Sequence, residues 1–341
     1  MIKRTRFGQQ LFLAVAATTL LAGSPPANLQ AALIAYEPFD YPAGSELMGL
    51  GGGSGWTSPW GIRPASFGPP PPGHYTVGGG SLAAPAGLPT HGNHGYFLGV
   101  PAFPSRELGR MFPDVVGAPD TTLWISFLGQ RIGEATAPGT TGWPNNPYPR
   151  SANLSFFDVQ PTLARRSERI GIGNSTTSNN PDPNHYDEWS LIPEGLPINR
   201  VGQADHMPRQ SELAWAVVRI DFLGDATVPD NAWLWLNPDP RAGEPLKANA
   251  DVTILNNHAN ALDYSGIDMA RPFVGNGDTA PAGVRPPAEM LLDEIRIGTT
   301  WLDVNGGVPE PSSGALALCG WLAVWMWRRV RRRYRVPLLI C

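Results

Sequence analysis

The chain has 341 residues, with 25 Lys and Arg against 29 Asp and Glu, and a formal net charge of −4. Nine of the basic residues and one acidic residue lie in the two terminal segments, which leaves 16 basic and 28 acidic residues, a net charge of −12, between them. An acidic body of this kind offers no basic stripe for phosphate contacts, so a nucleic-acid-binding role is excluded.

The first segment of the chain has the three parts of a secretory signal peptide. Lys3, Arg4 and Arg6 precede an apolar stretch at residues 11–22, and small residues lead to Ala31. The apolar stretch is too short for a membrane span, and this order is typical of an export signal that is removed. We therefore expect a signal peptide over residues 1–31 and a body outside the cytoplasm.

The body lacks cysteine, because the two cysteines of the chain, Cys319 and Cys341, both lie in the C-terminal segment. A secreted protein without disulfides must be held together by its own hydrophobic core. The chain contains 39 Gly and 37 Pro, a composition that favours short strands joined by turn-rich loops over helices.

Several segments of the body show the alternation of a half-buried strand. Residues 121–132 place Leu123, Ile125 and Phe127 on one face, and residues 213–223 place Val218 and Ile220 inward. Further strands are expected at the segments 96–100, 152–159, 169–172, 188–192, 231–237, 251–255 and 290–298. The pattern predicts an all-β fold, a two-sheet antiparallel sandwich without an amphipathic helix in the body.

The tryptophans of residues 231–237 allow two interpretations of that strand. In residues 231–237, Trp233 and Trp235 share one face, so this strand is either covered on both sides or displays a tryptophan platform. Trp124, Trp215 and Trp233 are expected in the core. Trp143, in a loop rich in Pro and Asn, is the candidate for stacking against a sugar.

Catalytic patterns are lacking. Glycoside hydrolysis needs two carboxylates facing one sugar ring, but no Glu-x-Asp occurs in the chain, and the adjacent Asp293 and Glu294 are expected on opposite faces of a strand. There is no Gly-x-Ser-x-Gly elbow, and the body has no thiol. These observations predict a protein that is not an enzyme and carries no catalytic residues.

Calcium is the one cofactor with some support. Residues 179–188 concentrate oxygen ligands, with Asp182, Asp187 and Glu188 as the candidate metal ligands. A polar surface loop explains the same residues and is the favoured interpretation. The default expectation is therefore no cofactor.

The C-terminal segment has three parts in a fixed order. Val308, Pro309, Glu310 and Pro311 form an extended motif, and an apolar stretch follows at residues 314–327. A basic cluster then comes next, made of Arg328, Arg329, Arg331, Arg332, Arg333 and Arg335. Tryptophans beside such a cluster are typical of a cytoplasmic membrane interface, so we expect a short transmembrane helix here.

These three parts resemble the PEP-CTERM sorting tail of exported bacterial proteins. The resemblance implies a tail over residues 306–341 that anchors the protein in the membrane. An exosortase, a membrane-embedded processing enzyme, would recognise the motif and cut near it. The protein would then reside at the cell surface or in extracellular matrix.

The body also resembles a known group. The phrases LWISFLG, SERIGIGN, VVRIDF, WLWLNP and LLDEIRIGTTWLDV look like landmarks of proteins with a concanavalin A-like or laminin G-like jelly roll. The resemblance implies one jelly-roll domain over residues 32–305, with its first and last strands close together.

These observations together predict a non-enzymatic, exported surface or matrix protein that binds polysaccharide. The alternative is a carbohydrate-active hydrolase on a jelly-roll fold with a non-standard carboxylate pair. A third interpretation, an inert spacer, predicts neither a ligand-binding face nor convergent carboxylates. The fold alone does not decide among the three, because jelly rolls host all of them.

Overall fold

The computed structural model describes ten stretches of the chain, residues 33–62, 68–99, 106–133, 151–158, 167–174, 187–196, 200–203, 207–224, 228–275 and 287–307. The expected signal peptide lies outside these residues, as does the C-terminal sorting tail from residue 308 onward. In the part that is described, no helix is both long enough and apolar enough to cross a membrane.

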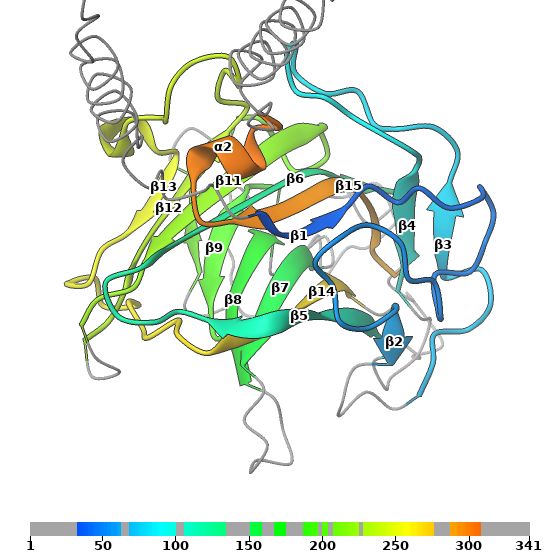
Figure 1. The fold of residues 1–341 in the computed structure, drawn as a ribbon, viewed down its shortest axis with the longest axis horizontal. Helices are drawn as coiled ribbons and strands as arrows, with labels where there is room; N and C mark the ends of the chain where they lie inside the picture. The colour runs from blue at the N-terminus through cyan, green and yellow to red at the C-terminus, as the bar shows by residue number, and fades with distance from the viewer. Residues whose placement is uncertain are drawn as a thin grey trace, which may run out of the picture.

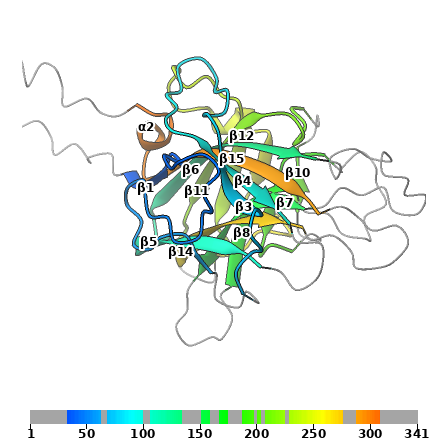
Figure 2. The same cartoon turned by 90° about the vertical axis from the view of Figure 1, so that its right-hand side faces the viewer.

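Two antiparallel sheets make up the described fold, which confirms the predicted jelly-roll sandwich (Figure 1). The eight-stranded sheet contains, in spatial order, β13 (Val252–Ile254), β12 (Asn231–Leu236), β11 (Ala214–Asp221), β6 (Thr122–Ile132), β15 (Glu289–Gly298), β4 (His94–Leu98) and β3 (Tyr75–Gly78), with β1 (Leu33–Glu37) also paired to β15. The seven-stranded sheet runs β10 (Val201–Gly202), β9 (Ser190–Pro193), β8 (Ser167–Asn174), β7 (Ala152–Asp158), β14 (Ile267–Val274), β5 (Leu108–Val116) and β2 (Gly61–Ile62). The turned view places β5 and β14 along one side of the molecule and β12 along the other (Figure 2).

The first and last strands of the body lie side by side. Leu33 of β1 faces Gly298 of β15, and Glu37 faces Ile295. This pairing confirms the expectation that the two ends of the domain meet. A short helix follows, α2 (Trp301–Val304), which starts at a capping box formed by Thr300 and Asp303.

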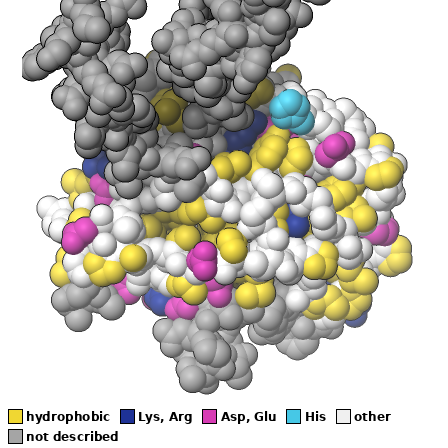
Figure 3. Space-filling view, viewed as in Figure 1, with side chains coloured by type: hydrophobic (Ala, Val, Ile, Leu, Met, Phe, Trp, Pro, Cys, Tyr) yellow, Lys and Arg dark blue, Asp and Glu magenta, His cyan; other side chains and the backbone are white. Residues whose placement is uncertain are grey.

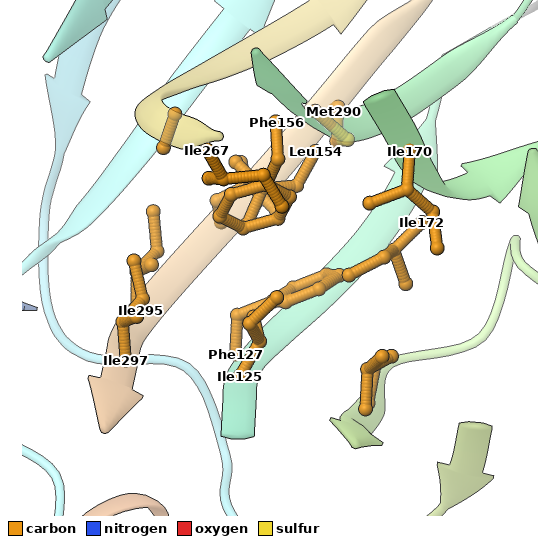
Figure 4. Close-up of a cluster of buried hydrophobic side chains, with 14 of the residues drawn as sticks. Ile125, Phe127, Leu154, Phe156, Ile170, Ile172, Ile267, Met290, Ile295 and Ile297 are labelled. Carbon is orange, nitrogen blue, oxygen red and sulfur yellow. The ribbon is translucent and has the colours of Figure 1, made fainter. Parts of the chain in front are cut away.

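Side chains from both sheets fill the space between them. Figure 4 shows Ile125 and Phe127 of β6, Leu154 and Phe156 of β7, and Ile295 of β15 converging in this core. All five are at most 1% exposed. The predicted inward faces of the segments 121–132, 213–223 and 290–298 are therefore confirmed, because the side chains of a strand alternate with period two.

A second apolar cluster covers the outer face of the eight-stranded sheet. We call it the tryptophan layer, and it consists of Trp124, Trp215, Trp233, Trp235 and Trp301. The indole of Trp124 stacks on that of Trp235, with 5.8 Å between the ring centroids, and meets Trp301 edge-on at 5.7 Å. Each ring is at most 5% exposed. Of the two alternatives for residues 231–237, the covered strand is thus the observed one, and Trp233 and Trp235 form no open platform.

Candidate functional site

The outer face of the seven-stranded sheet has the opposite character. Leu154 and Phe156 of β7 point into the core, so Asn153, Ser155 and Phe157 point outward. A polar row therefore runs along a strand whose residues are all buried. Buried polar side chains require partners, and those partners come from the neighbouring strands.

Arg271 of β14 is the centre of this face. Its Nη1 donates to Oε2 of Glu107 at 2.7 Å, and its Nη2 donates to Oε2 of Glu168 at 2.9 Å and to the Ser155 hydroxyl at 3.0 Å. Ser155 in turn donates to Oδ1 of Asn153 at 2.5 Å. We call Glu107, Ser155, Glu168 and Arg271 the Arg271 cluster.

Two aromatic rings hold the guanidinium in place. The central carbon of the Arg271 guanidinium lies 4.6 Å from the ring centroid of Phe157 and 4.7 Å from that of Phe273. Such stacking fixes the plane of the group, so its N–H edges are presented across the strands toward Glu107 on one side and Glu168 on the other. The aromatic contacts therefore set the direction in which the two carboxylates are held.

Electrostatics favour the charged form of the arginine. Burial lowers the pKa of Arg271, but the charges of Glu107 and Glu168 more than offset it, and the net shift is upward. Two carboxylates share the one guanidinium of Arg271. The Nε atom of Arg271 is buried and has no hydrogen-bond partner among the described residues.

The arrangement sets the separation of the two carboxylates. Because they bind opposite ends of a single guanidinium, their oxygens lie within about 10 Å of each other, the range that paired carboxylates need to act on one sugar ring. The side chain of Glu107 is 4% exposed and that of Glu168 is 17% exposed. The cluster can therefore supply two carboxylates of unequal exposure on one face of the sheet.

A glycine beside β9 makes room for Glu168. Gly195 has a φ of +62°, and a Cβ atom at this position would lie 2.2 Å from Cδ of Glu168. Any larger residue would be strained in this conformation and would displace the carboxylate. The turn after β9 is thus part of what positions the cluster.

Asp293 and Glu294 form a second pair of neighbouring carboxylates, and here the prediction of opposite faces is wrong. The register of β15 shifts between Asp293 and Arg296, and Glu294 has a φ of +53°, so the strand bulges at this point. Asp293 accepts hydrogen bonds from the hydroxyl of Ser81 and the backbone N–H of Leu82, and Glu294 accepts from the backbone N–H of His91. Both carboxylates therefore hold the same covering segment.

Burial raises the pKa of Asp293 to about 7, although hydrogen bonds from Ser81 and Leu82 act in the opposite direction. A raised pKa beside a second carboxylate is typical of a catalytic acid. The oxygens of both residues, however, bind the segment that closes over the tryptophan layer. This pair anchors a loop, and the Arg271 cluster remains the better candidate site.

Two of the predicted calcium ligands, Asp187 and Glu188, lie in the described part of the chain, and each pairs with an arginine. Asp187 pairs with Nη2 of Arg131 at 2.6 Å, and Glu188 pairs with Nη2 of Arg200 at 3.3 Å. Each of these two carboxylates is therefore paired with the guanidinium of an arginine. Within the described stretches, no group of three or more His, Cys, Asp or Glu side chains is placed to hold a metal ion.

The remaining predicted site residues fall outside the described part of the chain. These are Asp182, Trp143, the sorting motif from Val308 to Pro311, and the basic cluster from Arg328 to Arg335. Their proposed roles stay predictions.

Sequence reasoning missed the Arg271 cluster because its members are far apart in the chain. Glu107 precedes Arg271 by 164 positions and Glu168 precedes it by 103. No local motif joins them. The available signal was an arginine in the middle of the apolar strand IDMARPFV, a position that requires an acidic partner if it is buried.

Solved structures with a similar fold were found at low sequence identity. An endo-1,3-β-glucanase from Streptomyces sioyaensis is 10% identical, with 81% of this chain and 99% of that chain covered and a TM-score of 0.44. A β-1,3-glucanase from Mycobacterium marinum is 12% identical over 80% and 99% of the two chains, with a TM-score of 0.38. The catalytic domain of a GH131 β-glucanase from Podospora anserina is 12% identical over 73% and 88%, with a TM-score of 0.39.

No family model matches the chain, and no curated protein matches it. The three solved structures are named as glucanases, a finding that contradicts the prediction that the chain is not an enzyme. That prediction is withdrawn. At these identities and TM-scores the likeness concerns the fold, so the candidate site depends on its own geometry.

Proposed function

We propose that the chain is a carbohydrate-active hydrolase in which Glu107 and Glu168 are the carboxylate pair. The observation that carries the proposal is that one buried guanidinium, Arg271, binds both carboxylates on the same outward face. This is a non-standard pair, because its two members come from separate segments beside β5 and on β8. Arg271 would act as a positioning residue.

The chemistry requires one carboxyl group and one carboxylate. The carboxyl group protonates the glycosidic oxygen as the bond to the anomeric carbon breaks, and the leaving sugar departs as an alcohol. The carboxylate either attacks the anomeric carbon or removes a proton from the water that does so. Water adds across the bond in either route, and no cofactor or oxidant is needed.

The test is an assay of the full chain against soluble polysaccharides, with new reducing ends as the readout. Glu107→Gln and Glu168→Gln keep the side-chain shape and remove the charge. We expect each to lower the rate by about 10²-fold or more, because a positioned acid or base contributes about that much. Cleavage that survives in both variants would contradict the assignment.

Glu188→Gln is the matched control for these variants. Glu188 is also buried and paired with an arginine beside the same sheet, but it lies outside the Arg271 cluster. If all three variants lose stability, the cause is the loss of a buried ion pair. If only Glu107→Gln and Glu168→Gln lose rate, the cause is the Arg271 cluster. We expect the Glu188→Gln variant to cleave at the wild-type rate per folded molecule.

We also propose that the protein is exported, anchored by its C-terminal segment and processed by an exosortase, with extracellular polysaccharide as its partner. The support is the order of the sorting motif, apolar stretch and basic cluster in the sequence. Replacing Pro309, Glu310 and Pro311 by alanine should leave the tail uncut and the protein in the membrane fraction. Identical size and location of the variant and wild type would contradict this proposal.

A further inference from the structure

We propose that the face of the sandwich covered by α2 docks on the lipid bilayer through exposed apolar side chains. We call this surface the α2 patch, and it is built from residues 82–89, 239–250 and 301–307 together with Leu33 at the start of β1. The inference rests on the proposed membrane anchor and names the part of the body that contacts the membrane. Docking in this way turns the Arg271 cluster, on the opposite outer face, away from the bilayer.

Three segments that are distant in sequence meet in the α2 patch. The indole Nε1 of Trp301 donates to the carbonyl oxygen of Ala242 at 3.3 Å. A Cβ atom on Gly306 would lie 2.5 Å from Cδ of Pro89, so the first segment lies against the end of α2. Leu88 belongs to the apolar cluster of the tryptophan layer. The segments therefore form one cover over that layer, on the eight-stranded sheet (Figure 1).

Apolar side chains point outward from this cover. Leu246 is 68% exposed, and Leu302 on α2 is 51% exposed. Leu33 is 42% exposed and pairs with Gly298, where a Cβ atom would lie 2.2 Å from Cβ of Asp303. Cross-strand partners share one face of a sheet, so Leu33 lies on the side that α2 covers. A single exposed leucine is ordinary, whereas three around one cover form an apolar surface that suits a partner.

The surface of the α2 patch carries no net charge, although the body has a net charge of −12. Residues 82–89 include no charged side chain, and residues 239–250 include two acidic and two basic ones. Of these, Arg241 pairs with Asp239 at 3.0 Å. Asp303 is 7% exposed and caps α2. An acidic body is repelled by anionic surfaces, so this neutral patch is the part best suited to approach a membrane.

The mode of contact follows from the distribution of charge. The face of the molecule seen in Figure 3 shows its visible Lys and Arg side chains scattered among acidic ones, without a broad basic field. Anionic headgroups are bound by clustered basic residues. Contact through the α2 patch therefore depends on buried apolar area and not on lipid charge, which makes neutral phosphatidylcholine the appropriate probe.

The length of chain after α2 brings the bilayer to this patch. Gly307 is the last described residue, and only residues 308–313 separate it from the apolar stretch at 314–327. Fully extended, this connection spans at most about 25 Å. The expected transmembrane helix therefore keeps the bilayer close to α2. The Arg271 cluster lies beyond both sheets, which pack about 10 Å apart in sandwiches.

The test uses single fluorophores on the full chain, reconstituted in phosphatidylcholine vesicles. Cys319→Ser and Cys341→Ser remove the native thiols, and Leu302→Cys or Leu196→Cys then carries a thiol-reactive dye. Leu196 is 45% exposed and follows β9 of the seven-stranded sheet, so it is the matched control. The two quenchers are phosphatidylcholine with a nitroxide on its acyl chain, and iodide in the water.

We expect the lipid nitroxide to lower the emission of the Leu302→Cys dye by about twofold or more, because interfacial side chains lie about 5–10 Å deep in the headgroup boundary. Iodide should quench the Leu196→Cys dye more strongly than the Leu302→Cys dye. Equal quenching of both dyes by iodide overturns the inference. A Leu302→Cys dye that is shielded from iodide but unaffected by the lipid nitroxide also overturns it, because another copy of the chain then covers the patch.

The second arm removes apolar area while the dye stays at Leu302→Cys. Leu33→Ser together with Leu246→Ser should reduce the lipid quenching, and Leu196→Ser should leave it unchanged. Lipid quenching that survives intact in the double variant contradicts apolar docking. Vesicle flotation is measured on the same samples: a chain that does not float refutes the membrane anchor and the inference with it, whereas a floating chain without lipid quenching refutes the docking alone.

Discussion

The two outer faces of the sandwich are built from the same strand alternation but filled in opposite ways. On the eight-stranded sheet the outward positions hold the tryptophan layer, closed over by the segment that Asp293 and Glu294 anchor. On the seven-stranded sheet they hold the Arg271 cluster. The first arrangement removes apolar surface from water, whereas the second buries an ion cluster.

The difference between the two faces separates the residues that stabilise the fold from those that we propose to carry out the chemistry. Burial of large aromatic rings stabilises a fold by several kcal/mol each. A buried ion cluster contributes less, since desolvation of the charges offsets their attraction. Groups retained despite that cost are candidates for function.

The largest effect is expected from the tryptophan layer. Trp215 is 0% exposed, so Trp215→Ala should lower the free energy of unfolding by about 3–5 kcal/mol. Urea denaturation followed by circular dichroism measures this loss. Phe273→Ala on the other face is the comparison and should lose clearly less, because Phe273 is only partly buried. Equal losses would remove the distinction between the faces.

The second effect comes from removing the centre of the Arg271 cluster. Arg271→Met leaves Glu107 and Glu168 without their shared cation, at an expected loss of about 3 kcal/mol. The triple variant that adds Glu107→Gln and Glu168→Gln should recover much of it, since no buried charge then lacks a partner. A triple variant less stable than Arg271→Met would contradict this account of the cluster.

A smaller effect concerns the loop anchor at Asp293. Burial raises the pKa of Asp293 from 3.8 to about 7, so the folded state holds this proton more tightly than the unfolded state. Stability from this group is therefore lost as the pH rises from about 4 to about 7, by about 2–3 kcal/mol between pH 5 and pH 8. Thermal unfolding of the wild type and Asp293→Asn across this range measures it. The variant should show a flatter profile, and parallel profiles would assign the slope to other groups.

The smallest effect is expected from an ion pair at the rim. Arg219 pairs with Glu244, whose side chain is 48% exposed. Glu244→Gln should change the free energy of unfolding by less than about 1 kcal/mol, because solvent screens such pairs. A larger loss, measured by the same urea titration, would show that the edge of the tryptophan layer depends on charge as well as packing.

The strands and their inward faces could be predicted from sequence, because the alternation of apolar and polar residues along a strand is a local signal. Phe127 and Ile295 were placed correctly on the inner face from their neighbours alone. The bulge at Glu294 could not be predicted, since it depends on pairing with β6 and on the segment that covers it. The candidate site was missed for a related reason: Glu107, Glu168 and Arg271 become neighbours only when strands distant in sequence pair.

The most direct test compares the two faces by their effect on hydrolysis. The measurement is the initial rate of reducing-end release from soluble β-1,3-glucan, per folded molecule, for Glu168→Gln and for Trp233→Phe in the tryptophan layer. Our account predicts a loss of about 10²-fold or more in the Glu168→Gln variant and a rate close to wild type in the Trp233→Phe variant. Wild-type cleavage by the Glu168→Gln variant, or a comparable loss in both, would contradict the assignment of the reaction to the Arg271 cluster.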